Sequence, residues 1–253
     1  MNYTFYGDLL GVSSYYKLGT DIAYSKLNLY YNITFKTLET YCQNNQDVQV
    51  LMFSDSMFMW GNDAFEALRQ LHRVYRKLLA HFLFLRGAMV ARKLEIDPRF
   101  TLSNFKKTLP KDDTLARAVG LEASQKGARL IIENDLARRL FQDNDQWLTH
   151  DGYIGGVSLH PQNEDVLRRI CPTPENDTYE FLYLWPPDLL PLEGPEEPGL
   201  AHYSIKSDLE ETGRMLSKGL QEHYKATIQL LKRCKQRDTF TERRLGREPQ
   251  TGS

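Results

Sequence analysis

Two aspartates have a context that could bind metal. Asp8 lies near the end of a short segment, residues 3–10, that reads as a strand, and Asp55 lies in the turn Ser54-Asp55-Ser56 between two further apolar segments. If these strands are neighbours, the two carboxylates meet at one sheet edge. Carboxylate oxygens suit Mg²⁺ or Mn²⁺, and two such ions can activate an oxygen nucleophile and neutralise a leaving phosphate. The simpler alternative is that Asp55 only forms the turn and Asp8 only caps a helix.

The turn that follows Asp8, Leu9-Leu10-Gly11-Val12, would open the next helix. Backbone N–H groups at a helix start have no partner within the helix, and they favour a polyphosphate. Other catalytic signatures are missing from the sequence. The six histidines show no metal-ligand spacing, and neither a P-loop nor a serine-hydrolase motif is present.

The apolar patterns predict the elements that must position these residues. We expect strands over 3–10, 48–53, 57–60, 82–90 (interrupted at Arg86-Gly87) and 128–133. We expect helices over 18–41, 62–81, 114–126 and from the end of the last strand to about 141. This β-α-β-β-α-β order, followed by a further helix and strand, is typical of a ferredoxin-like α+β sandwich. Residues 91–111 could form an exposed arm or a hairpin.

The chain divides by composition into three expected parts. Residues 1–142 form the core, and residues 143–198 an irregular β extension with a proline-rich connector. Residues 199–253 hold an amphipathic helix, expected over 205–237, and a basic tail. That helix could pack on its own domain or contribute to a dimer contact.

Composition excludes several classes of protein. The 253 residues carry 32 Lys and Arg against 33 Asp and Glu, so the net charge of −1 offers no electrostatic case for nucleic-acid binding. No apolar run is long enough to span a bilayer, and the first residues do not form a secretory signal. Three widely separated cysteines suit reduced thiols. We therefore expect a cytoplasmic protein without a membrane or nucleic-acid partner.

The segments around the two aspartates resemble the catalytic domain of class III nucleotide cyclases. Phe5-x-x-Asp8-Leu9-Leu10-Gly11 is similar to their first metal motif, and residues 50–58 are similar to their metal-bearing hairpin. Residues 85–89, 115–122 and 128–132 are similar to later core elements, so the resemblance covers about residues 3–140. It implies a nucleoside triphosphate substrate, a head-to-tail homodimer, and two Mn²⁺ or Mg²⁺ ions. The ligands would be Asp8, Asp55 and the Leu9 carbonyl.

Departures from the family pattern narrow the resemblance. Many members carry an Asn and, four residues later, an Arg on the helix near the triphosphate, where this chain has Ala116 and Gly120. The lysine that reads a purine falls near Leu51. This combination resembles the bacterial pyrimidine cyclases of antiphage defence, the uridylate and cytidylate cyclases of Pycsar systems. It implies conversion of UTP or CTP to the 3′,5′-cyclic mononucleotide and pyrophosphate. We expect UTP, although no residue selects it.

The same resemblance suggests roles for other residues. Leu10 and Gly11 would bind the triphosphate, and an arginine would meet the charge that develops on the phosphate. Arg117 is the expected catalytic arginine and Arg86 an expected substrate-binding one, while Arg92 is a further candidate. Two aromatic residues could wall the base pocket, although core packing is the simpler interpretation; they are Phe5 and Phe53.

Three alternative functions stay open from the sequence. One is a purine cyclase with altered base recognition, which the missing lysine opposes. Another is an inactive cyclase-like module that binds a nucleotide or a partner. It is favoured by the missing Asn/Arg pair and opposed by retention of both aspartates. The third is a polymerase-like palm domain, which would need a basic nucleic-acid channel that the composition does not supply.

Overall fold

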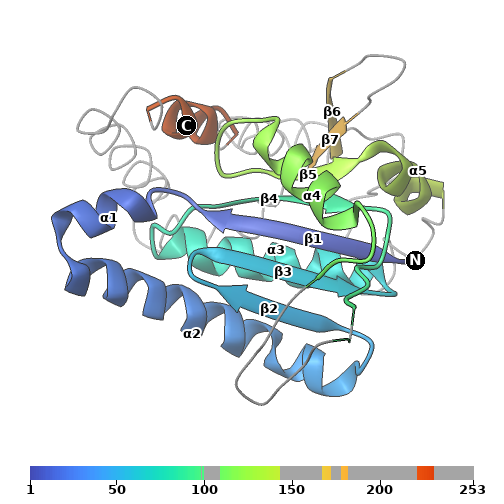
Figure 1. The fold of residues 1–253 in the computed structure, drawn as a ribbon. Coiled ribbons are helices and arrows are strands. Elements are labelled where there is room, and N and C mark those ends of the chain that lie inside the picture. Colours follow the sequence, from blue (N-terminus) through green and yellow to red (C-terminus); the bar gives the residue numbers. More distant parts are fainter. Residues whose placement is uncertain (98, 100–108, 143–166, 172–177, 182–220, 231–253) are drawn as a thin grey trace, which may run out of the picture.

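The computed structural model describes residues 1–97, 99, 109–142, 167–171, 178–181 and 221–230. Seven strands form one sheet in the order β2-β3-β1-β4-β5-β7-β6 (Figure 1). The strands are β1 (Tyr3–Leu9), β2 (Gln49–Phe53), β3 (Ser56–Gly61), β4 (Leu85–Val90), β5 (Leu130–Glu133), β6 (Leu167–Cys171) and β7 (Thr178–Phe181). Strand β1 lies between β3 and β4 and is antiparallel to both, whereas β4 and β5 run parallel.

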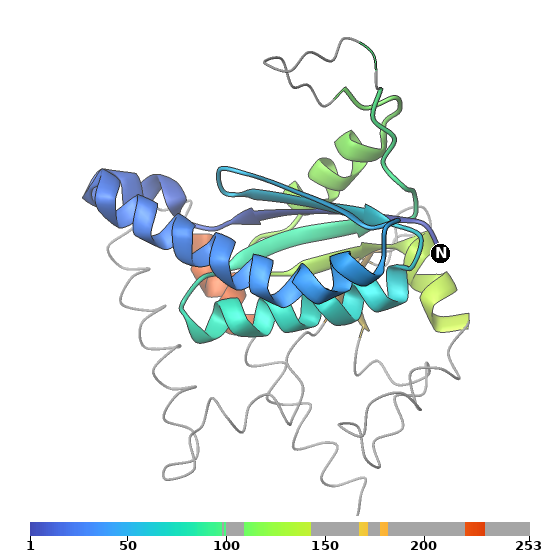
Figure 2. The same cartoon turned by 90° about the horizontal axis from the view of Figure 1, so that it is seen from below.

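Helices cover both faces of the sheet. They are α1 (Val12–Leu18), α2 (Thr20–Asn44), α3 (Ala64–Ala80), α4 (Thr114–Ala123) and α5 (Asn134–Gln142), and residues 221–230 are also helical. Helices α2 and α3 lie on one face, here called the core face, and α4 lies on the other, here called the α4 face (Figure 2). No helix among the described residues is long and apolar enough to cross a membrane.

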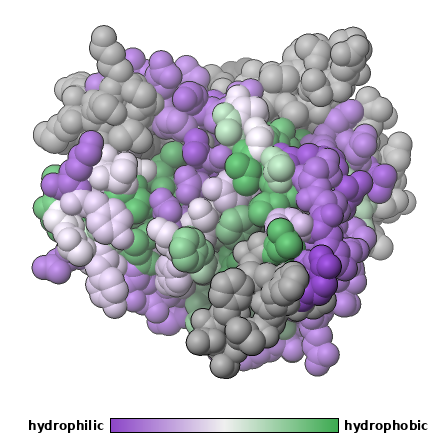
Figure 3. Space-filling view, viewed as in Figure 1, coloured by the Kyte–Doolittle hydropathy of each residue, from purple (hydrophilic) through white to green (hydrophobic). Residues whose placement is uncertain are grey.

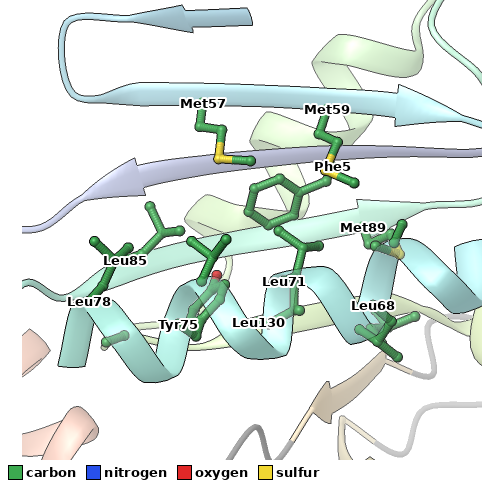
Figure 4. Packing of buried hydrophobic residues seen from close by; sticks show 14 of the residues in the cluster. Phe5, Met57, Met59, Leu68, Leu71, Tyr75, Leu78, Leu85, Met89 and Leu130 are labelled. Carbon is green, nitrogen blue, oxygen red and sulfur yellow. The ribbon is translucent and has the colours of Figure 1, made fainter. Parts of the chain in front are cut away.

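The core forms where α3 packs on the central strands. Apolar residues recur along α3 with helical spacing, and alternate residues of the strands point toward them. Phe5 from β1, Met57 and Met59 from β3, and Leu71 from α3 meet in this layer (Figure 4). Asp63 caps α3 by accepting hydrogen bonds from the N–H groups of the next turn.

The predicted ferredoxin-like core is confirmed, with β4-β1-β3-β2 in adjacent positions. The helix expected over 18–41 is confirmed as α2, and the separate helix α1 precedes it; Gly19, with a φ of 147°, separates the two. The strand expected over 82–90 begins only at Leu85, since Phe82 has a left-handed φ of 56°. The predicted interruption at Arg86-Gly87 is wrong, because both residues pair with β1 inside β4.

The later parts of the chain are described only in pieces. Strands β6 and β7 pair antiparallel and extend the sheet beyond β5, so the expected β extension contains regular strands. The isolated bridge between Ile96 and Pro110 closes the base of the expected hairpin arm. Of the helix expected over 205–237, residues 221–230 are described and helical. The proline-rich connector and the basic tail lie outside the described residues, and the division into three parts stays a prediction.

Candidate active site

The structure brings Asp8 and Asp55 together. Asp8 lies near the end of β1 opposite Ser56, the first residue of β3, and Asp55 is in the turn immediately before Ser56. The Leu9 N–H donates a hydrogen bond to the Asp55 carbonyl oxygen at 3.0 Å, which ties the turn to β1. Ser54 adopts a left-handed φ of 54°, which makes the turn tight. The two carboxyl groups therefore belong to adjoining backbone segments, as the sequence predicts.

Asp8 is held between a hydroxyl and a guanidinium. Ser56 Oγ donates to Asp8 Oδ1, and Arg86 Nη2 lies against Asp8 Oδ2, each at 3.4 Å. Burial raises the pKa of Asp8, and the neighbouring Asp55 carboxylate raises it further, while Arg86 opposes both effects. Arg86 thus contacts Asp8 directly, and its assignment as a substrate-binding residue stays a prediction.

Glu122 of α4 is a member of this cluster that the sequence did not reveal. Its side chain is only 2% exposed and forms an ion pair with Arg86 Nε. Burial raises the pKa of Glu122 to about 7, against the opposing charge of Arg86 and in the same direction as Asp8. The only sequence signal is that Ala118 and Glu122 are four residues apart on the buried side of α4.

The acid-rich cluster suits a divalent cation. Arg86 contacts both Asp8 and Glu122, and burial raises the pKa of Asp8, with a further rise from the Asp55 carboxylate that a bound cation would relieve. The two aspartates offer the hard oxygen donors that Mg²⁺ and Mn²⁺ prefer. Within the described residues, no group of three or more His, Cys, Asp or Glu side chains is arranged for a metal. The Leu9 carbonyl as third ligand stays a prediction.

The turn after Asp8 is fixed by backbone hydrogen bonds. The Leu10 N–H donates to the Phe84 carbonyl at 2.8 Å, and the N–H groups of Ser14 and Tyr15 donate to the Gly11 carbonyl. Gly11 has a φ of 84°, a conformation that strains residues with a Cβ. The Leu10 side chain is buried, so only the backbone of the turn is available to a ligand. A phosphate contact at Leu10 and Gly11 stays a prediction.

The two predicted aromatic residues lie in opposite environments. Phe5 has 0% exposure and packs in the core, which agrees with the simpler interpretation and places it away from any surface. Phe53 is 75% exposed at the end of β2, beside the Asp55 turn. Of the two, only Phe53 could contact a ligand without rearrangement of this protomer.

The structure does not bring Arg117 to the aspartates. Arg117 forms an ion pair with Glu133, and Glu133 also accepts a hydrogen bond from the Ala91 N–H at 2.9 Å. Ala91 follows the end of β4 that lies opposite Arg86, so this pair marks the far end of the central strands. Arg92 is likewise distant and pairs with Asp113 at 3.0 Å. A catalytic Arg117 stays a prediction, and on this geometry it would have to act on a partner protomer.

An apolar row lies next to the acidic row on the α4 face. Asp8 pairs across the sheet with Ser56, and the adjacent row on the same face consists of Tyr6, Phe58 and Leu51. The Tyr6 and Phe58 rings lie 5.1 Å apart. Seen in the direction of Figure 1, apolar side chains reach the surface over the middle of the molecule between polar areas (Figure 3). A planar ligand beside the acids would therefore meet aromatic and aliphatic groups.

Comparison with solved structures supports the fold. A bacterial light-regulated adenylyl cyclase superposes with a TM-score of 0.51 at 15% identity, covering 72% of this chain and 90% of that one. The chain has the fold of nucleotide cyclase catalytic domains. The guanylyl cyclase domain of the RhoGC fusion protein from Blastocladiella emersonii matches with a TM-score of 0.49 at 10% identity, covering 72% and 95% of the two chains. The adenylyl cyclase CyaB from P. aeruginosa matches with a TM-score of 0.46 at 12% identity, covering 71% and 92%. The fold assignment rests on the first match.

Searches by sequence give no further information. No protein-family model matches the chain, and no curated protein matches it. At these low identities the structural likeness establishes the fold alone, so the function must be argued from the residues of the site.

Proposed function

We propose that this protein is a nucleotide cyclase that converts UTP, or alternatively CTP, to the 3′,5′-cyclic mononucleotide and pyrophosphate. The single observation that carries the proposal is the meeting of Asp8 and Asp55 at the end of β1, on a fold shared with nucleotide cyclases. Both acids lie on the backbone segments that the metal motifs of that fold would use. We infer that they hold two divalent cations, Mn²⁺ or Mg²⁺.

The residues of the site would have different roles in an intramolecular phosphoryl transfer. Bound cations would acidify the ribose 3′-hydroxyl and neutralise charge on the departing pyrophosphate. Asp8 and Asp55 orient the reacting groups by fixing those cations, and the Leu10–Gly11 turn receives the phosphate chain. Arg86, already 3.4 Å from Asp8, is the guanidinium that this protomer can offer to the developing phosphate charge. The 3′-oxygen forms one bond to the α-phosphorus as the bond to pyrophosphate breaks.

A pyrimidine preference is supported by the apolar row beside the acids. The position near which purine cyclases carry a lysine falls at Leu51, and its cross-strand neighbour is Phe58. Neither side chain can form the hydrogen bonds that distinguish a purine edge, and a charged group is absent from this row. A smaller base stacked on Tyr6 and Phe58 would fit such a surface. The choice of UTP over CTP has no residue-level support.

A head-to-tail homodimer would use the α4 face. Exposed apolar residues on this side include Phe53 at the hairpin, Leu109 in the arm and Val119 on α4. Covering them would remove apolar surface from water, and it would bring α4 of one protomer toward the acids of the other. The role in antiphage signalling rests on the resemblance to pyrimidine cyclases alone.

The test is product analysis with each nucleoside triphosphate. The full-length protein is incubated with Mn²⁺ and each of the four NTPs, and products are resolved by mass spectrometry. Asp8→Asn and Asp55→Asn run alongside, with Asp47→Asn as a control because Asp47 is exposed and remote from the cluster. One cyclic pyrimidine nucleotide, lost in both site variants and kept in the control, supports the proposal. Formation of a cyclic purine nucleotide would contradict the pyrimidine assignment and identify a purine cyclase.

One observation favours a second candidate, an inactive cyclase-like module that binds a nucleotide. Ala116 and Gly120 are exposed on α4 and present no polar side chain where active relatives would carry a transition-state clamp. Such a module would bind a non-hydrolysable NTP with Mn²⁺ in a calorimeter and form no product from any NTP.

A further inference from the structure

Residues 221–230, here called the docking helix, pack on the framework behind the aspartates. We propose that this helix holds the Leu10–Gly11 turn in place and that Tyr224 is the positioning residue through which it acts. Nucleotide binding would then require the docked helix, although the segment lies about 80 residues beyond the core. The inference rests on the proposed function for its consequence and on contacts within the chain for its mechanism.

The docking helix is fixed by hydrogen bonds to the start of β5. The Gly127 N–H donates to His223 Nδ1 at 3.2 Å, and the Ala128 N–H donates to Thr227 Oγ1 at 2.9 Å. The Thr227 hydroxyl in turn donates to the His223 carbonyl at 2.9 Å. His223 and Thr227 are both buried, so loss of either acceptor would leave a buried N–H group without a partner. These hydrogen bonds therefore fix which residues of the docking helix lie against Gly127 and Ala128.

Gly127 permits the close approach of this helix. A Cβ placed on Gly127 would lie 2.9 Å from both the Thr227 backbone nitrogen and the Ala226 Cβ. The φ of Gly127 is 95°, a conformation that larger residues rarely adopt. The backbone before β5 thus lies directly against the docking helix, with no room for an intervening side chain.

Tyr224 connects the helix to the turn after Asp8. Its side chain is only 5% exposed, and its ring packs edge-on against the Phe84 ring with 5.9 Å between centroids. The Phe84 carbonyl is the acceptor that holds the Leu10 N–H. The Tyr224 hydroxyl also lies 3.3 Å from the place where a Cβ on Gly11 would be. Tyr224 therefore touches both residues that determine where the turn lies.

The docking helix also lies close enough to Arg86 for that charge to affect the pKa of His223. Burial and the charges of Arg86 and Lys126 together lower the pKa of His223 to about 4, while Glu222 opposes them. His223 is consequently neutral near pH 7, which leaves Nδ1 free to accept the Gly127 N–H. The same Arg86 contacts Asp8, so the docking helix and the acidic cluster share one neighbour.

Hydrogen exchange in the full-length protein tests the mechanism without requiring catalysis. In Tyr224→Ala the Leu10 amide should exchange about tenfold faster or more than in the wild type, because Phe84 loses its packing partner. Tyr41→Ala is the matched control, since Tyr41 is 7% exposed and packs at the far end of α2. It should lower global stability without selectively exposing Leu10. Equal exchange at Leu10 in the two variants would overturn the proposal.

A second pair of variants keeps the test valid if Tyr224→Ala does not fold. Thr227→Val removes the acceptor of the Ala128 N–H, whereas Thr227→Ser retains it. Faster Leu10 exchange in the valine variant, with recovery in the serine variant, supports docking through this contact. Exchange at Leu10 that matches the wild type in both variants would contradict it.

Kinetics then separate this inference from the proposed function. With an active wild type, Tyr224→Ala should raise KM for the Mn²⁺–nucleotide about tenfold and change kcat less than about threefold, since the turn binds phosphate rather than reacting. Faster exchange with an unchanged KM would refute the link between turn and nucleotide. If the wild type forms no product from any NTP, the proposed cyclase fails, and the exchange results still decide whether the helix holds the turn.

Discussion

Strand β1 presents side chains to two faces of the sheet, and the two faces have opposite chemistry. On the core face, Phe5 packs among the methionines of β3 and the leucines of α3 (Figure 4). On the α4 face, Asp8 lies in a row with Ser56 and contacts Arg86, which in turn pairs with the buried Glu122. Residues three positions apart on one strand thus serve different purposes.

The difference teaches where stability and chemistry are located. The core face gains stability mainly from buried apolar area. The α4 face holds Asp8 and Glu122 against the guanidinium of Arg86, and burial raises the pKa of both acids. Substitutions on the core face should therefore change the free energy of unfolding, and substitutions on the α4 face should change metal binding and turnover.

The largest expected effect on stability comes from two phenylalanines in contrasting positions. Phe5→Ala should lower the free energy of unfolding by about 3–5 kcal/mol, because it leaves a cavity in the core. Phe53→Ala should change it by less than about 0.5 kcal/mol, since that side chain is mostly exposed. Urea unfolding monitored by circular dichroism measures both. Similar losses in the two variants would show that the core face does not carry the stability.

The pH dependence of stability should report Glu122. Its pKa of about 7 in the folded protein is above the ordinary value of 4.5, so the folded state binds more protons between these values. Stability from this group therefore falls as pH rises from about 4.5 to 7. Glu122→Gln should remove that slope in metal-free urea titrations. The difference between wild type and variant isolates Glu122, because His223 contributes a slope of opposite sign at pH 4 to 6.5. An unchanged slope would show that Glu122 titrates normally.

A smaller effect should follow from Gly87→Ala, beside Phe5 on the core face. A Cβ at Gly87 would lie 2.5 Å from the Phe5 ring and 2.8 Å from the Tyr6 carbonyl oxygen. Overpacking of this kind should cost about 1–3 kcal/mol. Phe5→Leu should recover part of that cost in the double variant. A double-mutant cycle with zero coupling would contradict the contact.

A small effect on stability is also expected at Arg117. Its ion pair with Glu133 is partly exposed, so Arg117→Gln should cost less than about 1 kcal/mol. If Arg117 acts on a partner protomer, mixing Arg117→Gln with Asp8→Asn should restore activity, because one of the two sites in the mixed dimer is then intact. Two inactive proteins that stay inactive after subunit exchange would refute a role across the interface.

Much of this arrangement could be predicted from local sequence. The cap at Asp63, the apolar stripe of α3 and the hairpin at Asp55 follow from capping, periodicity and turn chemistry, which depend on neighbouring residues alone. The placement of both aspartates followed once the strand order was predicted.

Other features depend on contacts that no local pattern encodes. The break at Gly19 between α1 and α2 depends on backbone conformation, and the continuity of β4 through Gly87 depends on the Phe5 ring that fills the space beside Gly87. Glu122 joins Asp8 only through Arg86 on another strand. The docking helix contacts the backbone before β5, from which it is separated by nearly 100 residues in the sequence. These contacts are set by tertiary packing, and a pattern read along the chain cannot detect them.

The most direct test of the account is whether Asp8 and Asp55 bind one cation together. Free Mn²⁺ is followed by electron paramagnetic resonance during titration of the full-length protein with a non-hydrolysable UTP analogue present. The account predicts that Asp8→Asn and Asp55→Asn each weaken Mn²⁺ binding by about tenfold or more, while Asp47→Asn binds like the wild type. Wild-type affinity in either site variant would contradict a shared metal site.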